Sequence, residues 1–340
     1  MTMTLNLPSK TQAASPVEQD WVAAAPRAVR GELPRTLMLR HGGEAAVTIR
    51  YELLGGEGAP LLIVAGGISA GRHVLSSAEF PEPGWWQGQA ASLDCRRFRL
   101  LAIDWIAADG LVDRPVDPAD QASALAHLLD HLGIPAAAAF IGASYGGMVG
   151  MQFASAHPAR LGALLAISAA AQAHPFSSGC RALQRRAVAL GETAGDAAAG
   201  VALARSLAML TYRTPEEFAD RFAASPTIAD GTVRVAAEDY LDHHGERHCR
   251  RMSASAYRRL SESIDLHCVD PVAIAVPLAL AAVDSDALVP PADVRVLADA
   301  IPGARFQLLH SRYGHDAFLK EEAQVAALIA DFLETLEPTA

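Results

Sequence analysis

The sequence predicts an α/β fold, with a mostly parallel central sheet, helices on both faces and an inserted helical cap. Three observations support this prediction. Short apolar runs typical of buried strands alternate with helical patterns along most of the chain. The strand pattern is lost between positions 175 and 270, where helical patterns follow one another. Finally, a serine flanked by glycines stands between a predicted strand and a predicted helix.

The composition is that of a folded, globular protein. The chain has 340 residues, which is enough for one large core with an inserted subdomain. Hydrophobic residues make up 51% of the sequence and charged residues 19%, which argues against a disordered chain. The formal net charge of −10 argues against non-specific binding to nucleic acid.

The sequence gives no reason to expect a membrane partner or a bound metal. The longest apolar run, residues 271–283, has 13 residues and contains Pro277, whereas a membrane-spanning helix needs roughly 18–20. The N-terminal segment lacks the apolar region of a secretory signal. The four cysteines fit neither a zinc pattern nor a disulfide scaffold. We therefore expect a cytoplasmic protein with free thiols and small-molecule partners.

The expected elements follow in chain order, after a flexible arm over residues 1–35. Apolar runs predict strands, and apolar residues at helical spacing predict the helices between them. Before the cap, strands are expected over 46–54, 60–67, 99–105, 136–142 and 161–168, and helices over 118–133 and 145–158. After the helical cap, 175–270, come strands over 276–286 and 304–310 and a last helix over 323–336. The core is therefore assigned to 36–174 and 271–340.

The stretch Gly142-Ala143-Ser144-Tyr145-Gly146 has the pattern Gly-x-Ser-x-Gly. Where a strand turns sharply into a helix, glycines on both sides relieve the crowding around a serine on strained backbone. The hydroxyl of such a serine projects at the carboxyl end of the sheet, where it can act as a nucleophile. The pattern alone also fits a plain turn, but the predicted strand before it and helix after it favour a nucleophile.

A nucleophilic serine requires a histidine as base and an acid that orients this histidine. On parallel sheets of this kind the three residues follow in the order Ser, Asp or Glu, His. Asp286 follows a late predicted strand, and His315 follows the next strand and precedes the last helix. We therefore predict Ser144, Asp286 and His315 as the catalytic residues, with Asp284 as the alternative acid and His310 as the alternative base.

Backbone N–H groups from two segments are candidates for stabilising the negative charge that develops on a reacting carbonyl oxygen. The N–H of Tyr145 lies at the start of the helix after the serine. A second donor is expected from the loop after the strand at 60–67, where Gly66 and Gly67 let the backbone come close to a substrate. The alternative is that these two glycines only form a tight turn.

Five segments carry a resemblance to a known family: GASYGGM, LAMLTYRTPEEF, SASAYRRLSESIDL, VDSDALVPP and GHDAFL, in this order. With them the sequence resembles the homoserine O-acyltransferases of the α/β-hydrolase fold, from about residue 60 to the C-terminus. TYRT and GHDAFL are the most specific segments, because generic hydrolases lack this pair. At one position the sequence departs from the family, since Tyr145 stands where methionine or leucine is usual.

The resemblance implies an acyl transfer in two steps. Ser144 would take an acyl group from acyl-CoA, and the side-chain hydroxyl of homoserine would take it from the serine, with His315 as the base in both steps. Arg213, in TYRT, would hold the carboxylate of the amino acid, and Asp316 would hold its ammonium group. Alternatively, Arg213 forms a salt bridge within the cap and Asp316 caps the last helix.

The resemblance also implies acyl-CoA as co-substrate, no other cofactor, and a homodimer. The phosphates of CoA need positive charge, and arginines are frequent in the cap: Arg181, Arg185, Arg186, Arg247, Arg250, Arg251, Arg258 and Arg259. Members of the family transfer acetyl or succinyl groups, and the divergent, shortened sequence slightly favours succinyl. The alternatives are a serine O-acyltransferase, or an esterase or thioesterase that uses the same three catalytic residues.

Overall fold

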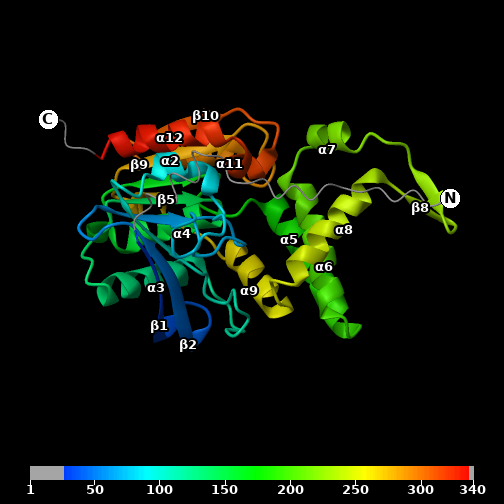
Figure 1. Ribbon diagram of the computed structural model, residues 1–340, viewed down its shortest axis with the longest axis horizontal. Coiled ribbons are helices and arrows are strands. Elements are labelled where there is room, and N and C mark those ends of the chain that lie inside the picture. The colour runs from blue at the N-terminus through cyan, green and yellow to red at the C-terminus, as the bar shows by residue number, and fades with distance from the viewer. Residues whose placement is uncertain (1–26, 337–340) are drawn as a thin grey trace.

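The computed structural model describes residues 27–336, and an eight-stranded sheet forms the centre of this part (Figure 1). Its strands are β1 (Ala28–Leu39), β2 (Gly43–Leu54), β3 (Leu61–Ala65), β4 (Arg99–Ile103), β5 (Ala139–Ala143), β6 (Leu164–Ile167), β9 (Leu278–Val283) and β10 (Arg305–Leu309). They lie in the order β1-β2-β4-β3-β5-β6-β9-β10. β2 is antiparallel to both β1 and β4, and all other neighbours are parallel. The predicted mostly parallel sheet is confirmed.

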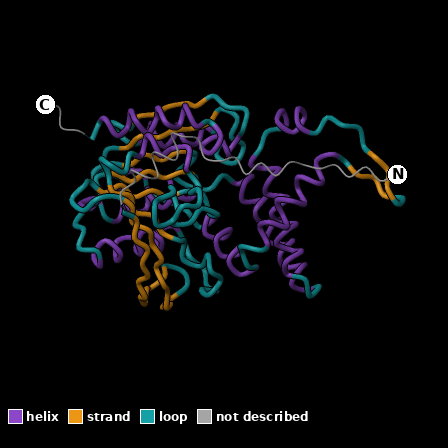
Figure 2. The backbone as a smooth tube through the Cα atoms, in the orientation of Figure 1, coloured by secondary structure: helices purple, strands orange, loops and turns teal. Residues whose placement is uncertain are grey.

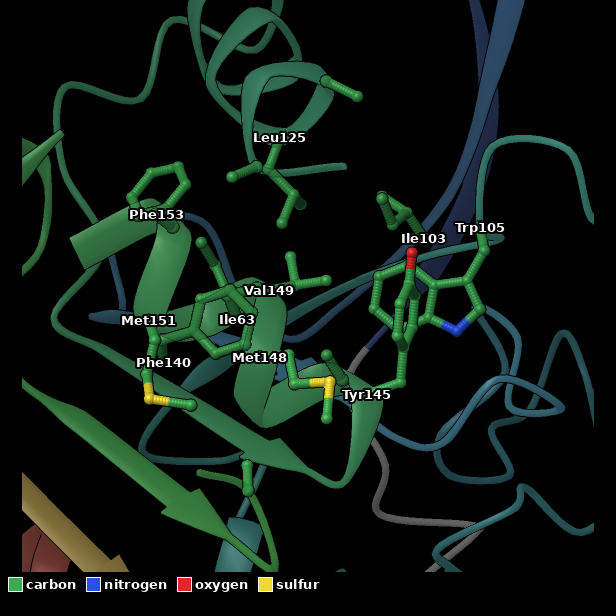
Figure 3. Close-up of a cluster of buried hydrophobic side chains, with 14 of the residues drawn as sticks. Ile63, Ile103, Trp105, Leu125, Phe140, Tyr145, Met148, Val149, Met151 and Phe153 are labelled. Atoms are coloured by element: carbon green, nitrogen blue, oxygen red, sulfur yellow. The ribbon is translucent and has the colours of Figure 1, made fainter. Parts of the chain in front are cut away.

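Each central strand contributes side chains to two cores, because neighbouring side chains point to opposite faces of a sheet. Leu62 and Ile63, adjacent on β3, belong to different clusters of buried residues. The face of Ile63 is covered by α3 (Pro118–His131), α4 (Tyr145–Ala156) and α10 (Pro291–Ala300), and the face of Leu62 by α2 (Ala90–Leu93) and α12 (Glu322–Glu334). Figure 3 shows Val149 and Phe153 of α4 beside Phe140 of β5. Burial on both faces explains why these strands are continuously apolar.

Between β6 and β9 the chain leaves the sheet and forms the cap. Its helices are α5 (Pro175–Thr193), α6 (Ala197–Tyr212), α7 (Pro215–Arg221), α8 (Ala236–Cys249) and α9 (Ala254–Asp265). Helix α6 packs against α5 and α8, and α9 packs against α5 and α6. In Figures 1 and 2 these helices stand at one end of the molecule, beside the sheet, with α9 nearest to it.

The expectation of a flexible arm over 1–35 is wrong from Ala28 onward. Residues 28–35 belong to β1, which pairs with β2 along its whole length; residues 1–26 lie outside the described part of the chain. Strand β1 is at the edge of the sheet, and most of its side chains are exposed. Its apolar pattern is therefore too sparse to identify a strand.

The cap also contains a short hairpin that the sequence did not predict. Its strands, β7 (Thr227–Ala229) and β8 (Thr232–Arg234), are joined by Asp230 and Gly231, which have φ angles of 52° and 74°. Strands of three residues are too short to show an alternating pattern, but the Asp-Gly pair is a typical hairpin signal.

Within residues 27–336, no helix is both long and apolar enough to cross a membrane. The same residues contain no cluster of three or more histidine, cysteine or acidic side chains that could hold a metal ion.

Candidate active site

Ser144 lies on strained backbone between β5 and α4. Its φ of 54° and ψ of −119° are outside the regions that L-residues prefer. The flanking glycines make this turn possible. A Cβ on Gly142 would lie 2.4 Å from the carbonyl oxygen of Gly146, and a Cβ on Gly146 would lie 2.2 Å from the carbonyl oxygen of Ala65. The sharp turn that the sequence predicted is therefore present.

The structure brings the three predicted catalytic side chains together. Ser144 Oγ lies 2.7 Å from His315 Nε2, and His315 Nδ1 lies 2.7 Å from Asp286 Oδ2. The other carboxylate oxygen of Asp286 accepts hydrogen bonds from the N–H groups of Leu288 and Val289, at 2.9 and 3.0 Å. These bonds fix a carboxylate that has no solvent exposure, and the carboxylate in turn orients the imidazole.

The surroundings of His315 favour its protonated form. Burial lowers the pKa of the imidazole, but the carboxylates of Asp286 and, to a smaller extent, Asp316 raise it more, and the net pKa lies above its ordinary value. The contact with Asp286 also assigns the proton of the neutral ring to Nδ1. Nε2 then faces the hydroxyl of Ser144 as an acceptor, which is the arrangement that a general base needs.

The alternative acid and base form a separate pair. His310 Nδ1 lies 2.8 Å from Asp284 Oδ2, and Asp284 also accepts a hydrogen bond from the N–H of Ser311 at 3.0 Å. The side chain of His310 is 77% exposed, and no serine hydroxyl within the described residues contacts its ring. Asp284 thus connects the loops after β9 and β10, and the geometry favours Asp286 and His315 as the acid and base.

The loop after β3 is attached to the start of α4. The carbonyl oxygen of Gly66 accepts a hydrogen bond from the N–H of Gly146 at 2.8 Å. A Cβ on Gly66 would come within 2.7–2.9 Å of neighbouring side chains, whereas Gly67 lines the cavity at Ser144. The role of these glycines, and of the Tyr145 N–H, in stabilising an oxyanion stays a prediction.

The segments TYRT and GHDAFL, which carry the most specific part of the resemblance, meet beside the catalytic residues. Gly314 has a φ of 59°, and a Cβ there would lie 2.8 Å from the carbonyl oxygen of Tyr212. Arg213 Nε lies 2.9 Å from Asp316 Oδ2, and Arg213 Nη1 lies 3.0 Å from Glu217 Oε1. Positions about a hundred apart in the sequence therefore form one ion-pair cluster.

The two predicted substrate-binding residues occupy different places in this cluster. Asp316 lines the cavity with Ser144 and His315, and its side chain makes no capping bond to the following helix. Burial raises the pKa of Asp316, and the Arg213 guanidinium opposes this shift. The side chain of Arg213 is 8% exposed and is not part of the cavity wall. The salt bridge within the cap, which was its alternative role, is present, and its contact with a substrate carboxylate stays a prediction.

Two adjacent cavities lie between the core and the cap. The serine chamber, about 210 Å³, is lined by Ser144, His315 and Asp316 together with residues of α5, α6 and α9. The arginine chamber, about 490 Å³, has a wall formed by α6 and α8 on the cap side. The two chambers share Ile68, Ser69, Ala70 and Arg205 as lining residues, so they lie next to each other.

Most arginines that the sequence singled out are neutralised by carboxylates. Arg181 and Arg185 both contact Asp265. Arg250, Arg258 and Arg259 form ion pairs with other acidic side chains. Arg186 is exposed and lines neither chamber. Arg247 and Arg251 line the arginine chamber, and neither contacts a carboxylate within the described residues.

The sequence patterns did not single out Arg205, which lines both chambers. A signal was present, however, because Arg205 is the one charged residue of α6, whose sequence is AAAGVALARSLAMLTY. A single charge within an otherwise apolar helix usually faces a polar cavity or a partner.

The fold and the site define an α/β-hydrolase-fold enzyme with Ser-His-Asp geometry. The model of the alpha/beta hydrolase fold family matches residues 60–322. The chain is also 53% identical to a homoserine O-succinyltransferase of Xanthomonas campestris pv. campestris, over 93% of this chain and 87% of the relative. It belongs to the homoserine O-acyltransferase family, as the sequence predicted.

One further relative agrees with this assignment, and a solved structure shares the fold. A serine O-succinyltransferase of Litchfieldella anticariensis is 30% identical, over 89% of this chain and 97% of the relative. The solved structure of a homoserine O-acetyltransferase from Bacillus anthracis has a TM-score of 0.81 at 16% identity, over 90% of this chain and 97% of that one. At this identity the structural likeness supports the fold alone.

Proposed function

We propose that the protein transfers a succinyl group from succinyl-CoA to the side-chain hydroxyl of L-homoserine, as in methionine biosynthesis. The observation that carries this proposal is the position of Asp316, a carboxylate on the wall of the cavity into which Ser144 and His315 open. The name of the relative at 53% identity, homoserine O-succinyltransferase, supports the same acceptor and acyl group.

In the first step, Ser144 takes the acyl group. His315 Nε2 accepts the proton of the serine hydroxyl while Oγ attacks the carbonyl carbon of the thioester. The Tyr145 N–H and the loop containing Gly66 and Gly67 stabilise the resulting oxyanion. The carbon–sulfur bond then breaks, His315 returns its proton to the sulfur, and CoA leaves with a free thiol.

In the second step, the hydroxyl of homoserine replaces CoA. His315 accepts the proton of this hydroxyl while its oxygen attacks the carbonyl carbon of the acyl-serine. The bond to Ser144 Oγ breaks, and His315 returns the proton to the serine. Asp316 binds the ammonium group of the amino acid, and Arg213 fixes the orientation of Asp316 and supplies positive charge toward the amino-acid carboxylate. A water molecule has neither an ammonium group nor a carboxylate for these residues to bind, so the site favours transfer to the amino acid over hydrolysis.

The arginine chamber fits the phosphate-bearing part of an acyl-CoA donor. Arg247 and Arg251 line this chamber without a carboxylate partner within the described residues, in a protein with a net charge of −10. Burial and neighbouring arginines lower the pKa of His248 to about 3 and that of His244 to about 4. Positive charge without a counter-ion among the described residues, in a cavity next to that of Ser144, favours a polyanionic ligand there.

Thiol release from succinyl-CoA, measured with and without homoserine or serine, tests this function. We expect release that depends on homoserine and yields O-succinylhomoserine by mass spectrometry. Ser144→Ala removes the nucleophile and should lower kcat by about 10⁴- to 10⁶-fold, with an unchanged far-UV circular dichroism spectrum. Release that needs no amino acid, or transfer by the alanine variant, would contradict the proposal.

We further propose that two copies of the chain associate through the outer face of the cap. Phe176, Leu183 and Leu190 are spaced seven residues apart on α5 and are 57–70% exposed. Leu203 and Leu210 repeat this spacing on α6 and are 55% and 48% exposed. Apolar residues at such spacing form a stripe on one side of a helix, and exposed apolar stripes mark association surfaces. The molar mass in solution tests this proposal.

A further inference from the structure

Arg205 lies close to the catalytic residues. Its Cζ atom is 5.1 Å from the centroid of the Tyr212 ring, and this ring centroid is 6.1 Å from that of His315. Both Arg205 and Tyr212 line the serine chamber. The tyrosine ring holds the guanidinium by a cation–π contact and leaves its N–H donors without a fixed partner.

Within residues 27–336 the guanidinium of Arg205 has no ion-pair partner, and its charge reaches a carboxylate only at longer range, where it opposes the raised pKa of Asp316. No carboxylate within the described residues lies within 4.0 Å of its guanidinium, and no hydrogen-bond acceptor there contacts it. Arg181, the other guanidinium on the wall of the serine chamber, is neutralised by Asp265 at 2.7 Å. The charge of Arg205 also contributes, after burial, to the low pKa values of His244 and His248. An unpaired, half-buried guanidinium is costly unless a ligand provides the anion.

We propose that Arg205 binds the free carboxylate of the succinyl group and thereby selects succinyl-CoA over acetyl-CoA; this inference rests on the proposed function. The thioester carbon must lie at Ser144, and the free carboxylate of a succinyl group is only three carbons further along the chain. The anion is therefore confined to the serine chamber and its border, where Arg205 lies. A planar guanidinium binds a carboxylate through two parallel hydrogen bonds. An acetyl group has no free carboxylate that the guanidinium could bind.

Two other anions of the reaction fit Arg205 less well. The phosphates of CoA are separated from the thioester by a long pantetheine arm, and Arg247 and Arg251 provide charge on the wall of the arginine chamber but not of the serine chamber. The carboxylate of homoserine belongs to a molecule whose ammonium group is expected at Asp316, beside Arg213. A substitution of Arg205 separates these possibilities, because each predicts a different kinetic parameter.

The test is a competition experiment with equal concentrations of succinyl-CoA and acetyl-CoA and one acceptor, homoserine. The ratio of the two products measures donor preference and does not depend on the amount of folded enzyme. We expect the wild-type protein to favour succinyl transfer. Arg205→Gln should lower this ratio by roughly 10- to 100-fold, as expected for the loss of a charged hydrogen-bonded pair. Arg205→Lys should retain part of the preference.

Separate kinetic measurements complete the test. In Arg205→Gln, kcat/KM should fall for succinyl-CoA, while kcat/KM for acetyl-CoA and KM for homoserine change by less than about threefold. Arg186→Gln, an equivalent change at an exposed arginine of α5, should leave all of these values unchanged. Arg247→Gln should lower kcat/KM for both donors equally.

Three outcomes would overturn the inference while leaving the proposed function intact. They are an equal loss for both donors in Arg205→Gln, a rise in KM for homoserine, and a wild-type protein that transfers both acyl groups equally well. Absence of homoserine-dependent transfer from either donor by the wild-type protein would instead reject the proposed function, and the inference with it.

Discussion

Among the neighbouring charged groups, Asp286 has the largest effect on the pKa of His315. Activity requires the neutral imidazole, so it falls as the pH drops through the pKa of His315 in the free enzyme. Asp286 raises this pKa against the opposing effect of burial. Asp286→Asn should therefore move the acid limb of the pH profile of kcat/KM to lower pH. The substitution should also lower kcat by about 10⁴-fold, because an asparagine no longer holds the His315 tautomer with its proton on Nδ1.

Asp284→Asn is the matched control for this prediction. The partner of Asp284 is the exposed His310, so its loss should leave the acid limb and kcat close to those of the wild-type protein. A shift of equal size in both variants would mean that the acid limb does not report on His315.

Asp316 is expected to distinguish the amino acid from water. Asp316→Asn removes the charge that binds the ammonium group, so KM for homoserine should rise by about 10- to 100-fold. Hydrolysis of succinyl-CoA in the absence of an amino acid should change little, because water needs no ammonium site. Steady-state kinetics with both acceptors measures the difference, and an unchanged KM for homoserine would remove this role from Asp316.

Between elements, the position after the nucleophile has a structural role. The side chain of Tyr145 is fully buried and packs edge-on against Trp105, with 4.9 Å between the ring centroids (Figure 3). Its hydroxyl lies 2.6 Å from Oγ of Ser263 on α9, and burial raises the pKa of the phenol. The tyrosine thus connects the start of α4, directly after Ser144, to a cap helix.

Tyr145→Phe should lower the free energy of unfolding by about 1–3 kcal/mol, because it leaves the buried hydroxyl of Ser263 without its partner. In a double-mutant cycle with Ser263→Ala, the second substitution should cost much less than it does alone. Chemical denaturation measures these values. Additive effects of the two substitutions would show that the hydroxyl pair does not couple α4 to α9.

The predictability of each element depended on its burial. The strands β3, β5 and β9 have apolar side chains on both faces, so their sequences show a continuous apolar run. The edge strand β1 and the strand β8 of the short hairpin are largely exposed, and their sequences consequently lack the apolar pattern of a strand, so that only the Asp-Gly pair indicates the hairpin. These strands were not predicted because their side chains are exposed, and an exposed strand needs no run of apolar residues.

For the whole molecule, association through the cap predicts a concentration-dependent mass. Leu183→Asp combined with Leu190→Asp places two charges on the exposed stripe of α5 and should convert a dimer into monomers in sedimentation velocity. The control is Val296→Asp on α10, which is equally exposed (69%) but lies outside the cap. A monomeric wild-type protein, or an unaffected mass in the double variant, would contradict the proposed dimer.

The sequence by itself determined the fold class, the turn at Ser144, and the order of Ser144, Asp286 and His315, because each depends on local apolar patterns and glycines at fixed spacing. Only the tertiary structure decided which charges are available to a ligand. Arg181, Arg213 and Arg205 carry the same guanidinium group, yet carboxylates from distant segments pair with the first two, whereas the third has no ion-pair partner within the described residues. Pairing between side chains depends on which helices pack together, and residue type alone does not encode that.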